Sequence, residues 1–447
     1  MTWREYHDAT KHTPDSLRRS RHVLDWANMP DPFRHYEGVP VFDLPADPPV
    51  PEIPALELLR GGSGTTGSGT TGSGTTDVTD GAEFLSQLLF YSAAVSASKR
   101  VPSTGARYAL RVNPSSGNLH PTEFHFVTRG LKDWPDGLYH YRASSHMAEQ
   151  RRAGLFQLPV GSAPIVFILT SIVWREAWKY GERAYRYCLH DIGHAWEALA
   201  LSARAIGRES RAVGDFVDDE IAGLCGLNPD ESPMLLIGLN GPAIPAAETK
   251  FTRLESTRSF GEVARTRRSA LDFIGTGSIS LAQLSAILEA ASSLACADFA
   301  ATRLIQLYLY VHRVEGLEPG VYRHCPRTGE LQPIRLGDQR VMAAGLSLGQ
   351  DLAGNACVAF SMIADLERAA RSYGDRGYRY AHFEAGAIGQ RLYLAAEALG
   401  LRATGIGAFF DDEVNRYLAL SPEQGQVVYH FAIGHPVPDT RLEANER

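Results

Sequence analysis

The sequence contains no CxxC pair, so the cysteine spacing typical of a zinc site is absent. An odd number of scattered cysteines fits reduced thiols better than a disulfide framework, and these five are Cys188, Cys225, Cys296, Cys325 and Cys357. The first residues are polar and lack the apolar core of a signal peptide. These absences predict a cytoplasmic location and no metal site.

Long apolar runs and an excess of positive charge are also missing. The longest apolar run, APIVFILTSIVW at 163–174, is too short to span a bilayer and is typical of a buried strand. The formal net charge of −7 argues against nucleic acid as a partner, because nucleic acid favours basic surfaces. We therefore expect a globular protein that binds neither membrane nor nucleic acid, and 447 residues suffice for two hydrophobic cores.

One phrase occurs twice in the chain. KYGERAYRY at 179–187 returns as SYGDRGYRY at 372–380, 193 residues later, and GDFVDDE at 214–220 returns as GAFFDDE at 407–413 with the same offset. A shared helical face would not repeat both Tyr-Arg-Tyr and Asp-Asp-Glu at one offset, so the pattern indicates a duplicated domain. We predict two homologous domains, at residues 78–245 and 262–440.

Each repeat has the same order of predicted elements. An amphipathic helix (82–95 and 280–293) is followed by a β-rich stretch, a buried strand and a long alanine-rich helix that ends at Gly207 or Gly400. A final strand closes each repeat, which predicts an α+β fold: two tandem α/β sandwich domains, with helices packed on a mostly antiparallel sheet.

Two segments lie outside the repeats. Residues 1–60 are rich in proline and aromatic residues and are expected to form an extended arm that wraps a neighbour. Residues 61–77 contain three copies of GSGTT, which is typical of a flexible linker.

The repeats differ where chemistry is most plausible. Only repeat 1 has RVNPSSGNLHP (111–121), with two hydroxyls and an amide next to a turn. Only repeat 2 has RTRRS (265–269), expected just before a helix, and the glycine pair of GIG (405–407). Lys179 of repeat 1 corresponds to Ser372. Each motif alone is more often a solvated helix start, a loop or a surface lysine, but their complementary loss suggests one shared site.

Together RTRRS, NPSSGNLHP, KYGERAYRY, GIGAFFDDE and the closing AIGHP resemble the nitroreductase superfamily of flavin enzymes and, within it, the SagB/ThcOx-type azoline dehydrogenases. The resemblance covers nearly the whole chain. It implies FMN held at the interface of a dimer, which here would be a pseudo-dimer of two nitroreductase-like domains in one chain. The implied cofactor-binding residues are Pro114, Ser115, Ser116 and Asn118 from repeat 1, with Arg265, Arg267, Arg268, Ser269, Gly405, Ile406 and Gly407 from repeat 2.

The residue types suit these implied roles. Arginine binds phosphate through a bidentate fork, Ser115, Ser116 and Asn118 can bond the edge of the flavin ring, and the backbone at 405–407 can approach flavin N5. Arg441 is a candidate to complete the phosphate site. The partner site related by the repeat has lost these residues, which predicts a single FMN per chain.

The resemblance implies an FMN-dependent oxidoreductase that dehydrogenates a heterocycle in a peptide-derived natural product, azoline to azole. Lys179 is the implied base and Tyr180 would orient or relay the proton, although Tyr180 could be a core aromatic because Tyr373 persists in repeat 2. An NAD(P)H-dependent nitro or quinone reductase, or a non-catalytic scaffold that binds FMN or a peptide, are the alternatives. Candidate partners are a small-molecule or peptide substrate and a cyclodehydratase complex, and the chain could be a monomeric pseudo-dimer or a larger homo-oligomer.

Because Tyr-Arg-Tyr survives in both repeats, it is expected to be structural. Arg186 and Arg379 are expected to pair with acids such as Asp191 and Glu384.

Overall fold

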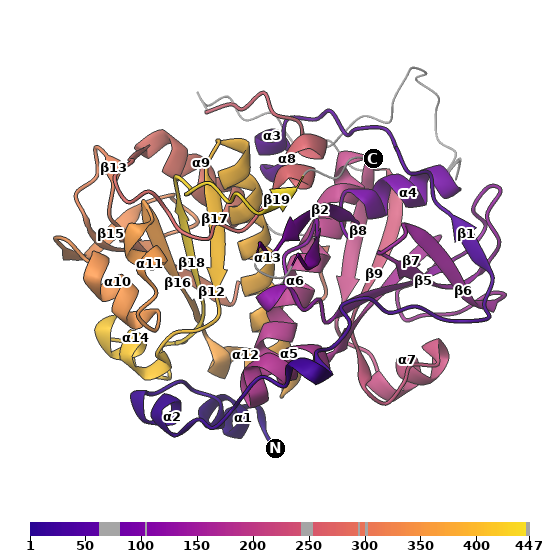
Figure 1. The fold of residues 1–447 in the computed structure, drawn as a ribbon, viewed down its shortest axis with the longest axis horizontal. Helices are drawn as coiled ribbons and strands as arrows, with labels where there is room; N and C mark the ends of the chain where they lie inside the picture. Colours follow the sequence, from indigo (N-terminus) through magenta and orange to yellow (C-terminus); the bar gives the residue numbers. More distant parts are fainter. Residues whose placement is uncertain (62–80, 103–104, 243–253, 294–295, 300–302, 444–447) are drawn as a thin grey trace.

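Two mostly antiparallel sheets, each built mainly from one half of the chain, share a common order of strands in the computed structural model (Figure 1). The model describes residues 1–447 except 62–80, 103–104, 243–253, 294–295, 300–302 and 444–447, so the GSGTT tract lies outside the described residues. The first sheet has the order β1 (Val41–Asp43), β6 (Met147–Ala153), β5 (Gly137–Arg142), β4 (Thr122–Thr128), β7 (Ile165–Ile172), β9 (Glu231–Pro242), β8 (Arg208–Val213) and β11 (Cys296–Ala297).

The second sheet repeats the central part of this order. It runs β15 (Leu331–Leu336), β14 (Gly320–His324), β12 (Ile305–Val311), β16 (Val358–Ala364), β18 (Gln426–Gly434) and β17 (Arg402–Ile406). Thus β5-β4-β7-β9-β8 in the first half corresponds to β14-β12-β16-β18-β17 in the second. The pairings within these two series are antiparallel. The predicted tandem α+β architecture is confirmed.

Two long helices lie between the sheets and pack against each other, α6 (Ala184–Ala205) and α13 (Arg376–Ala398) (Figure 1). They approach most closely at Gly193 and Gly386, which the repeat places at equivalent positions. A Cβ atom on Gly193 would overlap the Phe383 carbonyl oxygen, and one on Gly386 would overlap that of His190. The interface between the halves therefore requires glycine at its centre. Gly207 and Gly400 follow the two helices with φ of 78° and 72°, as the sequence predicted.

The duplicated phrase spans the start of each long helix. In the first half it covers the end of α5 (Val173–Tyr180), the 3₁₀ turn η3 (Gly181–Arg183) and the first turn of α6. In the second half it covers the end of α12 (Leu366–Tyr373) and the start of α13. The phrase therefore forms the joint between two helices, and a glycine with positive φ, Gly181 or Gly374, stands in each joint.

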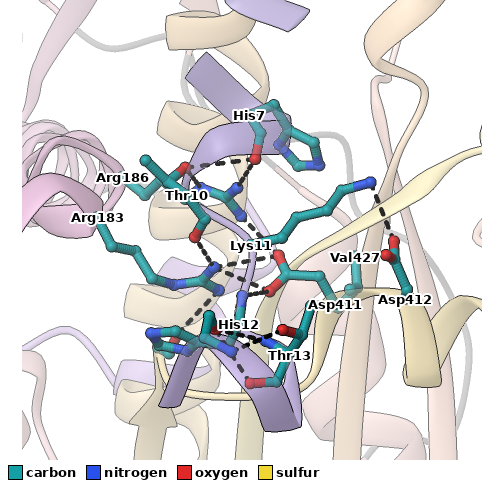
Figure 2. A network of polar contacts seen from close by, with 12 residues as sticks. His7, Thr10, Lys11, His12, Thr13, Arg183, Arg186, Asp411, Asp412 and Val427 are labelled. Atoms are coloured by element: carbon teal, nitrogen blue, oxygen red, sulfur yellow. Dashed lines mark hydrogen bonds and ion pairs between the residues drawn. The ribbon is translucent and has the colours of Figure 1, made fainter. Parts of the chain in front are cut away.

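The arginines of this phrase pair across the two halves. Arg186 Nη1 lies 2.7 Å and Arg183 Nη1 2.9 Å from the Asp411 carboxylate of the second half (Figure 2). The equivalent Arg379 and Arg376 reach Asp218 of the first half at 2.9 and 2.6 Å.

The expected pairing of Arg186 with Asp191, and of Arg379 with Glu384, is therefore wrong. Residues five apart on a helix are about 140° apart around its axis and cannot face each other. The Tyr-Arg-Tyr and Asp-Asp-Glu repeats are instead the two sides of a duplicated interface.

The ion-pair cluster around Asp411 is more deeply buried than the one around Asp218, so we expect its loss to cost more stability. Burial acts to raise the pKa of Asp411, but Arg183 and Arg186 outweigh it and lower that pKa. Because the Asp411 cluster is almost fully buried, Asp411→Asn should lower the free energy of unfolding by about 3–5 kcal/mol. Asp218 is about one third exposed, so Asp218→Asn should cost about 1 kcal/mol or less. Denaturant titration of both variants measures the difference, and equal losses would contradict this account.

The N-terminal arm wraps the two halves of its own chain. Its helices are α1 (Trp3–Ala9), α2 (Pro14–Arg19) and α3 (Ala55–Leu59). Next to α1, the His12 amide donates to Asp411 and the Thr10 carbonyl accepts from Arg183 (Figure 2). Further along, β1 pairs with β6 of the first sheet, and α3 is buried in the core that both halves share. The arm therefore helps to hold the halves together.

One predicted helix differs from the structure, and another is confirmed to within one residue at each end. The helix expected at 82–95 ends earlier, as α4 (Ala82–Phe90), and the chain then forms β2 (Val95–Arg100), which pairs with β3 (Arg107–Arg111). A C-terminal strand, β19 (Leu442–Glu443), joins β2, so the end of the second half crosses onto the first. The helix expected at 280–293 is α9 (Leu281–Ser292). Within the described ranges, no helix has both the length and the apolar character needed to cross a membrane.

Candidate functional site

A cavity of about 690 Å³ opens between the two halves. Its lining includes every predicted cofactor-binding residue except Arg265, together with Tyr180. Several residues to which the sequence assigned no role in this site also line it, namely Lys99, Arg111, Tyr187, Asp191, His194, Tyr393 and Tyr429. The motifs that each repeat kept therefore meet in one place.

The arginine-rich segment enters the cavity as extended chain. The short helix α8 (Phe260–Thr266) ends before Arg267, and the prediction that RTRRS precedes a helix is wrong. Beyond α8 the chain runs parallel to β17: Ser269 bridges Ala403, and the Ala270 amide donates to the Ala403 carbonyl at 2.9 Å. This pairing fixes the arginines beside the glycine pair of β17.

Arg267 and Arg268 are buried cations without a carboxylate partner among the described residues. Their guanidinium groups donate instead to carbonyl oxygens of the first half, Arg267 Nε to Val112 at 2.9 Å and Arg268 Nη2 to Ser96 at 3.1 Å. Arg267 Nη1 is buried and has no hydrogen-bond partner among the described residues. Burial lowers the pKa of Arg267 and lowers that of Arg268 to about 9. An anion in the cavity would compensate both charges.

Two predicted phosphate ligands lie elsewhere. Arg265 lies on the last turn of α8 and points to the first half. Its guanidinium lies over the Phe90 ring, 3.9 Å from the ring centroid, and donates to the Phe90 carbonyl. Arg441 does not line the cavity and pairs with Asp439 at 2.9 Å. Lys99 on β2 does line it, while also pairing with Asp439 at 2.9 Å. Of these three basic residues, Lys99 is the one that lines the cavity.

The loop that contains Pro114 and Ser115 is held in a strained shape. It forms the 3₁₀ turn η2 (Ser116–Asn118), in which Gly117 and Asn118 have φ of 58° and 61°. A non-glycine residue with positive φ is uncommon and persists only where its surroundings impose it. Here the Asp191 carboxylate of α6 accepts from the Ser116 amide at 3.2 Å and from its hydroxyl at 3.1 Å.

The other polar side chains of this loop also have partners within it. Asn118 Nδ2 donates to the Ala109 carbonyl at 3.0 Å, and Asn118 Oδ1 lies 3.1 Å from His120 Nε2. Ser115 Oγ accepts from the His120 amide at 2.8 Å. The loop hydroxyls and amide therefore first fix the shape of the loop, which limits what they can offer a ligand.

The Asp191 carboxylate is a buried titratable group of the cavity lining. Burial raises the pKa of Asp191 to about 7, although hydrogen bonds from Ser115 and Ser116 favour its charged form. Its counterpart Glu384 accepts from the amides of Leu304 and Ile305 in the second half. Because both carboxylates hold the chain of their own half, we assign Asp191 a positioning role beneath the loop.

The glycine pair is required by tyrosines on the neighbouring elements. A Cβ atom on Gly405 would overlap the Tyr429 hydroxyl, and one on Gly407 would overlap the Tyr187 ring. The Gly405 amide donates to the Tyr393 hydroxyl at 2.9 Å, and this hydroxyl also bonds Ser269 at 2.8 Å. The pair therefore permits close packing of aromatic rings on one wall of the cavity.

Tyr180 and Lys179, the predicted catalytic residues, lie against the strained loop. A Cβ atom on Gly117 would stand 2.7 Å from the Tyr180 hydroxyl and 3.1 Å from Lys179 Nζ. Burial raises the pKa of Tyr180, which keeps its phenol protonated. Tyr180 lines the cavity, whereas Lys179 lies at its edge and lines an adjoining one. Lys179 forms no ion pair within the described part of the chain.

Exchanging the two halves by the repeat gives a second position equivalent to the cavity, and this position is filled by protein. There β11 lies on β8, the counterpart of β17, and the Asp298 carboxylate accepts from the amide of Gly214, the counterpart of Gly407, at 2.9 Å. The Phe299 ring stacks on Tyr380, the counterpart of Tyr187, with centroids 4.3 Å apart. A cavity of only about 10 Å³ remains nearby. Residues 296–299, from the segment that corresponds to the Pro-Ser-Ser loop, thus form a plug at this position, and of the two related positions only the first holds a large cavity among the described residues.

Comparisons with known proteins agree with this architecture. A nitroreductase-like protein from Anabaena variabilis, known from a crystal structure, superposes with a TM-score of 0.77 at 27% identity, over 97% of this chain and 99% of that one. A nitroreductase-like protein of Methanocaldococcus jannaschii is 37% identical over 122 residues, which cover 27% of this chain and 61% of that protein. The match thus spans about three fifths of the length of this relative.

The fold also resembles part of the E. coli microcin synthetase McbBCD complex, at 20% identity and a TM-score of 0.34, over 44% of this chain and 79% of that one. A likeness of this size concerns the fold alone. The sequence profile of the nitroreductase family matches residues 92–241 and again residues 264–435. The chain therefore belongs to the nitroreductase family and carries two copies of its domain in one polypeptide.

Proposed function

We propose that the protein is an FMN-dependent oxidoreductase with one FMN in the cavity between its halves. Membership of the nitroreductase family supports an oxidoreductase activity in general. The observation that carries the proposal is the pair of buried arginines, Arg267 and Arg268, which face a cavity without a carboxylate partner among the described residues. A dianionic phosphate matches two such guanidinium groups in charge and geometry.

The remaining lining fits the flavin ring. The cavity volume of about 690 Å³ is within the range of ligand pockets, and Tyr187, Tyr393 and Tyr429 give it an aromatic wall. The strained loop at Pro114, Ser115, Ser116 and Asn118 forms the side that faces α5. Ser269 and the backbone at Gly405, Ile406 and Gly407 complete the set that would hold the cofactor.

The reaction that we propose is dehydrogenation of a heterocycle, azoline to azole, in a peptide or related natural product. When bound, FMN supplies an acceptor for the hydride that leaves a substrate carbon. Lys179 would take the proton from the neighbouring carbon as the C=C bond forms, so two electrons and one proton leave with the hydride and one proton goes to the amine. Tyr180, protonated and beside Gly117, orients this amine or the substrate.

Lys179 supports this reading through its position. The second half, whose site is plugged, has Ser372 at the equivalent position. In the first half Lys179 lies beside the loop at Gly117, next to the open cavity. A cyclodehydratase that makes azolines would be the natural source of substrate, and this partner remains a prediction.

An NAD(P)H-dependent nitro or quinone reductase is the second candidate, because both relatives at 27% and 37% identity are nitroreductase-like. Anaerobic mixing distinguishes the two. Our proposal predicts that an azoline peptide bleaches the flavin absorbance, faster than NADPH does. Rapid bleaching by NADPH, with nitroarene turnover that does not depend on Lys179, would favour the reductase. A purified protein that binds no flavin would favour a non-catalytic scaffold.

A further inference from the structure

A second cavity, of about 550 Å³, adjoins the first. We call it the arm cavity, because one of its walls is formed by Leu24, Trp26 and residues 29–33 of the N-terminal arm. The rest of the lining includes Tyr108, Leu119, Trp178 and Lys179. The two cavities share Lys99, Leu110, Gly117 and Asn118 in their linings. The two cavities therefore adjoin at the strained loop.

The arm wall is fastened at both ends to elements of the proposed active site. On the α5 side, Trp178 Nε1 donates to the Asp25 carbonyl at 2.8 Å, His22 Nε2 lies 3.0 Å from the Trp178 carbonyl, and the Trp26 and Trp178 rings meet edge to face at 5.3 Å. On the β3 side, Arg111 Nη2 donates to the Pro32 carbonyl at 2.6 Å, and the Arg111 guanidinium lies over the Phe33 ring. The wall is thus built in place before a ligand arrives.

The chemistry of the arm cavity limits what it can take. Its lining is mostly apolar and aromatic. Lys99 and Arg107 are paired with Asp439 and Glu443, and the Asp31 carboxylate accepts from the Phe33 amide. Lys179 is the cation that remains without an ion pair in the described residues, and it lies at the junction with the first cavity. Away from Lys179 and Asp31, a charged ligand group would therefore lose hydration in the arm cavity without gaining a partner, whereas an aromatic group would gain burial.

We propose that the arm cavity binds an apolar, preferably aromatic, substituent of the substrate, and that Trp26 and Trp178 select for it. This inference rests on the proposed function, since it places the ring to be oxidised at the junction beside Gly117 and Lys179. The substrate class is accordingly an uncharged heterocycle that carries an aromatic group next to the ring. The arm thus acts as a specificity element in addition to holding the two halves together.

Trp26→Ala is the test, because this side chain is about two thirds exposed and its loss should not impair folding. The probe is 2-phenylthiazole, titrated into the flavin-loaded protein and followed by isothermal calorimetry. We expect Trp26→Ala to weaken binding at least tenfold. The matched control is Trp174→Ala, also exposed and on the same helix as Trp178 but outside the lining, and it should change affinity less than twofold. Equal affinity in wild type and Trp26→Ala, or no binding to wild type, would overturn the proposal.

Kinetics separates this inference from the proposed reaction. With azoline peptides that carry phenylalanine or glycine beside the ring, Trp26→Ala should lower the preference for phenylalanine in kcat/KM at least tenfold, mainly through KM. If azolines are not oxidised at all while binding of 2-phenylthiazole still depends on Trp26, the reaction is refuted and the arm cavity stands. If azolines are oxidised with an unchanged preference in Trp26→Ala, the arm cavity is refuted and the reaction stands.

Discussion

Replacing Lys179 with alanine should slow oxidation of the substrate by roughly 100- to 10,000-fold, the usual range for loss of a general base. Folding and flavin content should not change, because Lys179 is half-buried at the edge of the flavin cavity and has no ion pair within the described residues. Stopped-flow measurement of flavin reduction by a saturating azoline peptide separates the chemical step from binding.

Ser372→Ala is the matched control for this variant. Ser372 occupies the equivalent position of the second half, next to the plugged site, and its loss should leave the rate within about twofold of wild type. Equal reduction rates in wild type and Lys179→Ala would remove Lys179 from the mechanism and favour the nitro or quinone reductase.

Removing Arg268 should lower the affinity for FMN about tenfold or more. A charge-assisted hydrogen bond is worth about 1.5–3 kcal/mol, and 1.4 kcal/mol corresponds to a factor of ten in Kd. Arg268→Ala and Arg267→Ala should both show the effect, because both guanidinium groups line the cavity. Fluorescence titration of the flavin-free protein with FMN measures it, and thermal unfolding of the same samples shows any loss of stability from the missing contacts between the halves.

Arg265→Ala is the control for the arginine series. It removes an arginine of the same motif whose guanidinium lies on Phe90 outside the cavity, so the affinity for FMN should stay within about twofold of wild type. An Arg268→Ala protein with unchanged FMN affinity would show that the phosphate is bound elsewhere.

The repeat made most of the fold predictable from the sequence. Apolar spacing, together with Gly207 and Gly400, marked the long helices, and the 193-residue offset established that the halves are alike. The complementary loss of motifs also predicted that Pro114, Ser115, Arg267 and Gly405 would meet, and the structure places all of them in one cavity.

The contacts that the sequence could not predict depend on how the two halves pack against each other. Arg186 pairs with Asp411 rather than Asp191 because the partner comes from the other half, 225 residues away. No motif in the sequence marks Tyr393 or Tyr429, and the packing of α13 and β18 around the glycine pair brings them to the cavity wall. Arg265 was grouped with its neighbours because the motif is continuous, whereas the end of α8 at Thr266 turns its side chain away.

The duplicated phrase also explains why a lysine appears in only one copy. Both copies supply an interface arginine, Arg186 or Arg379, which accounts for the presence of Tyr-Arg-Tyr in each. Lys179 and Ser372 stand at the ends of α5 and α12, where only the first borders an open site. The shared interface thus accounts for what the two copies have in common, and the proposed site accounts for the lysine that they do not share.

The central claim is that one asymmetric site, built from both halves, holds the cofactor. The most direct measurement is the amount of flavin released from the purified protein by denaturation, determined by absorbance against protein concentration and identified by chromatography. We expect a yellow protein with about one FMN per chain, because Asp298 and Phe299 fill the position equivalent to the cavity in the other half. A ratio near two would show that the plug does not exclude a second cofactor and would contradict the account.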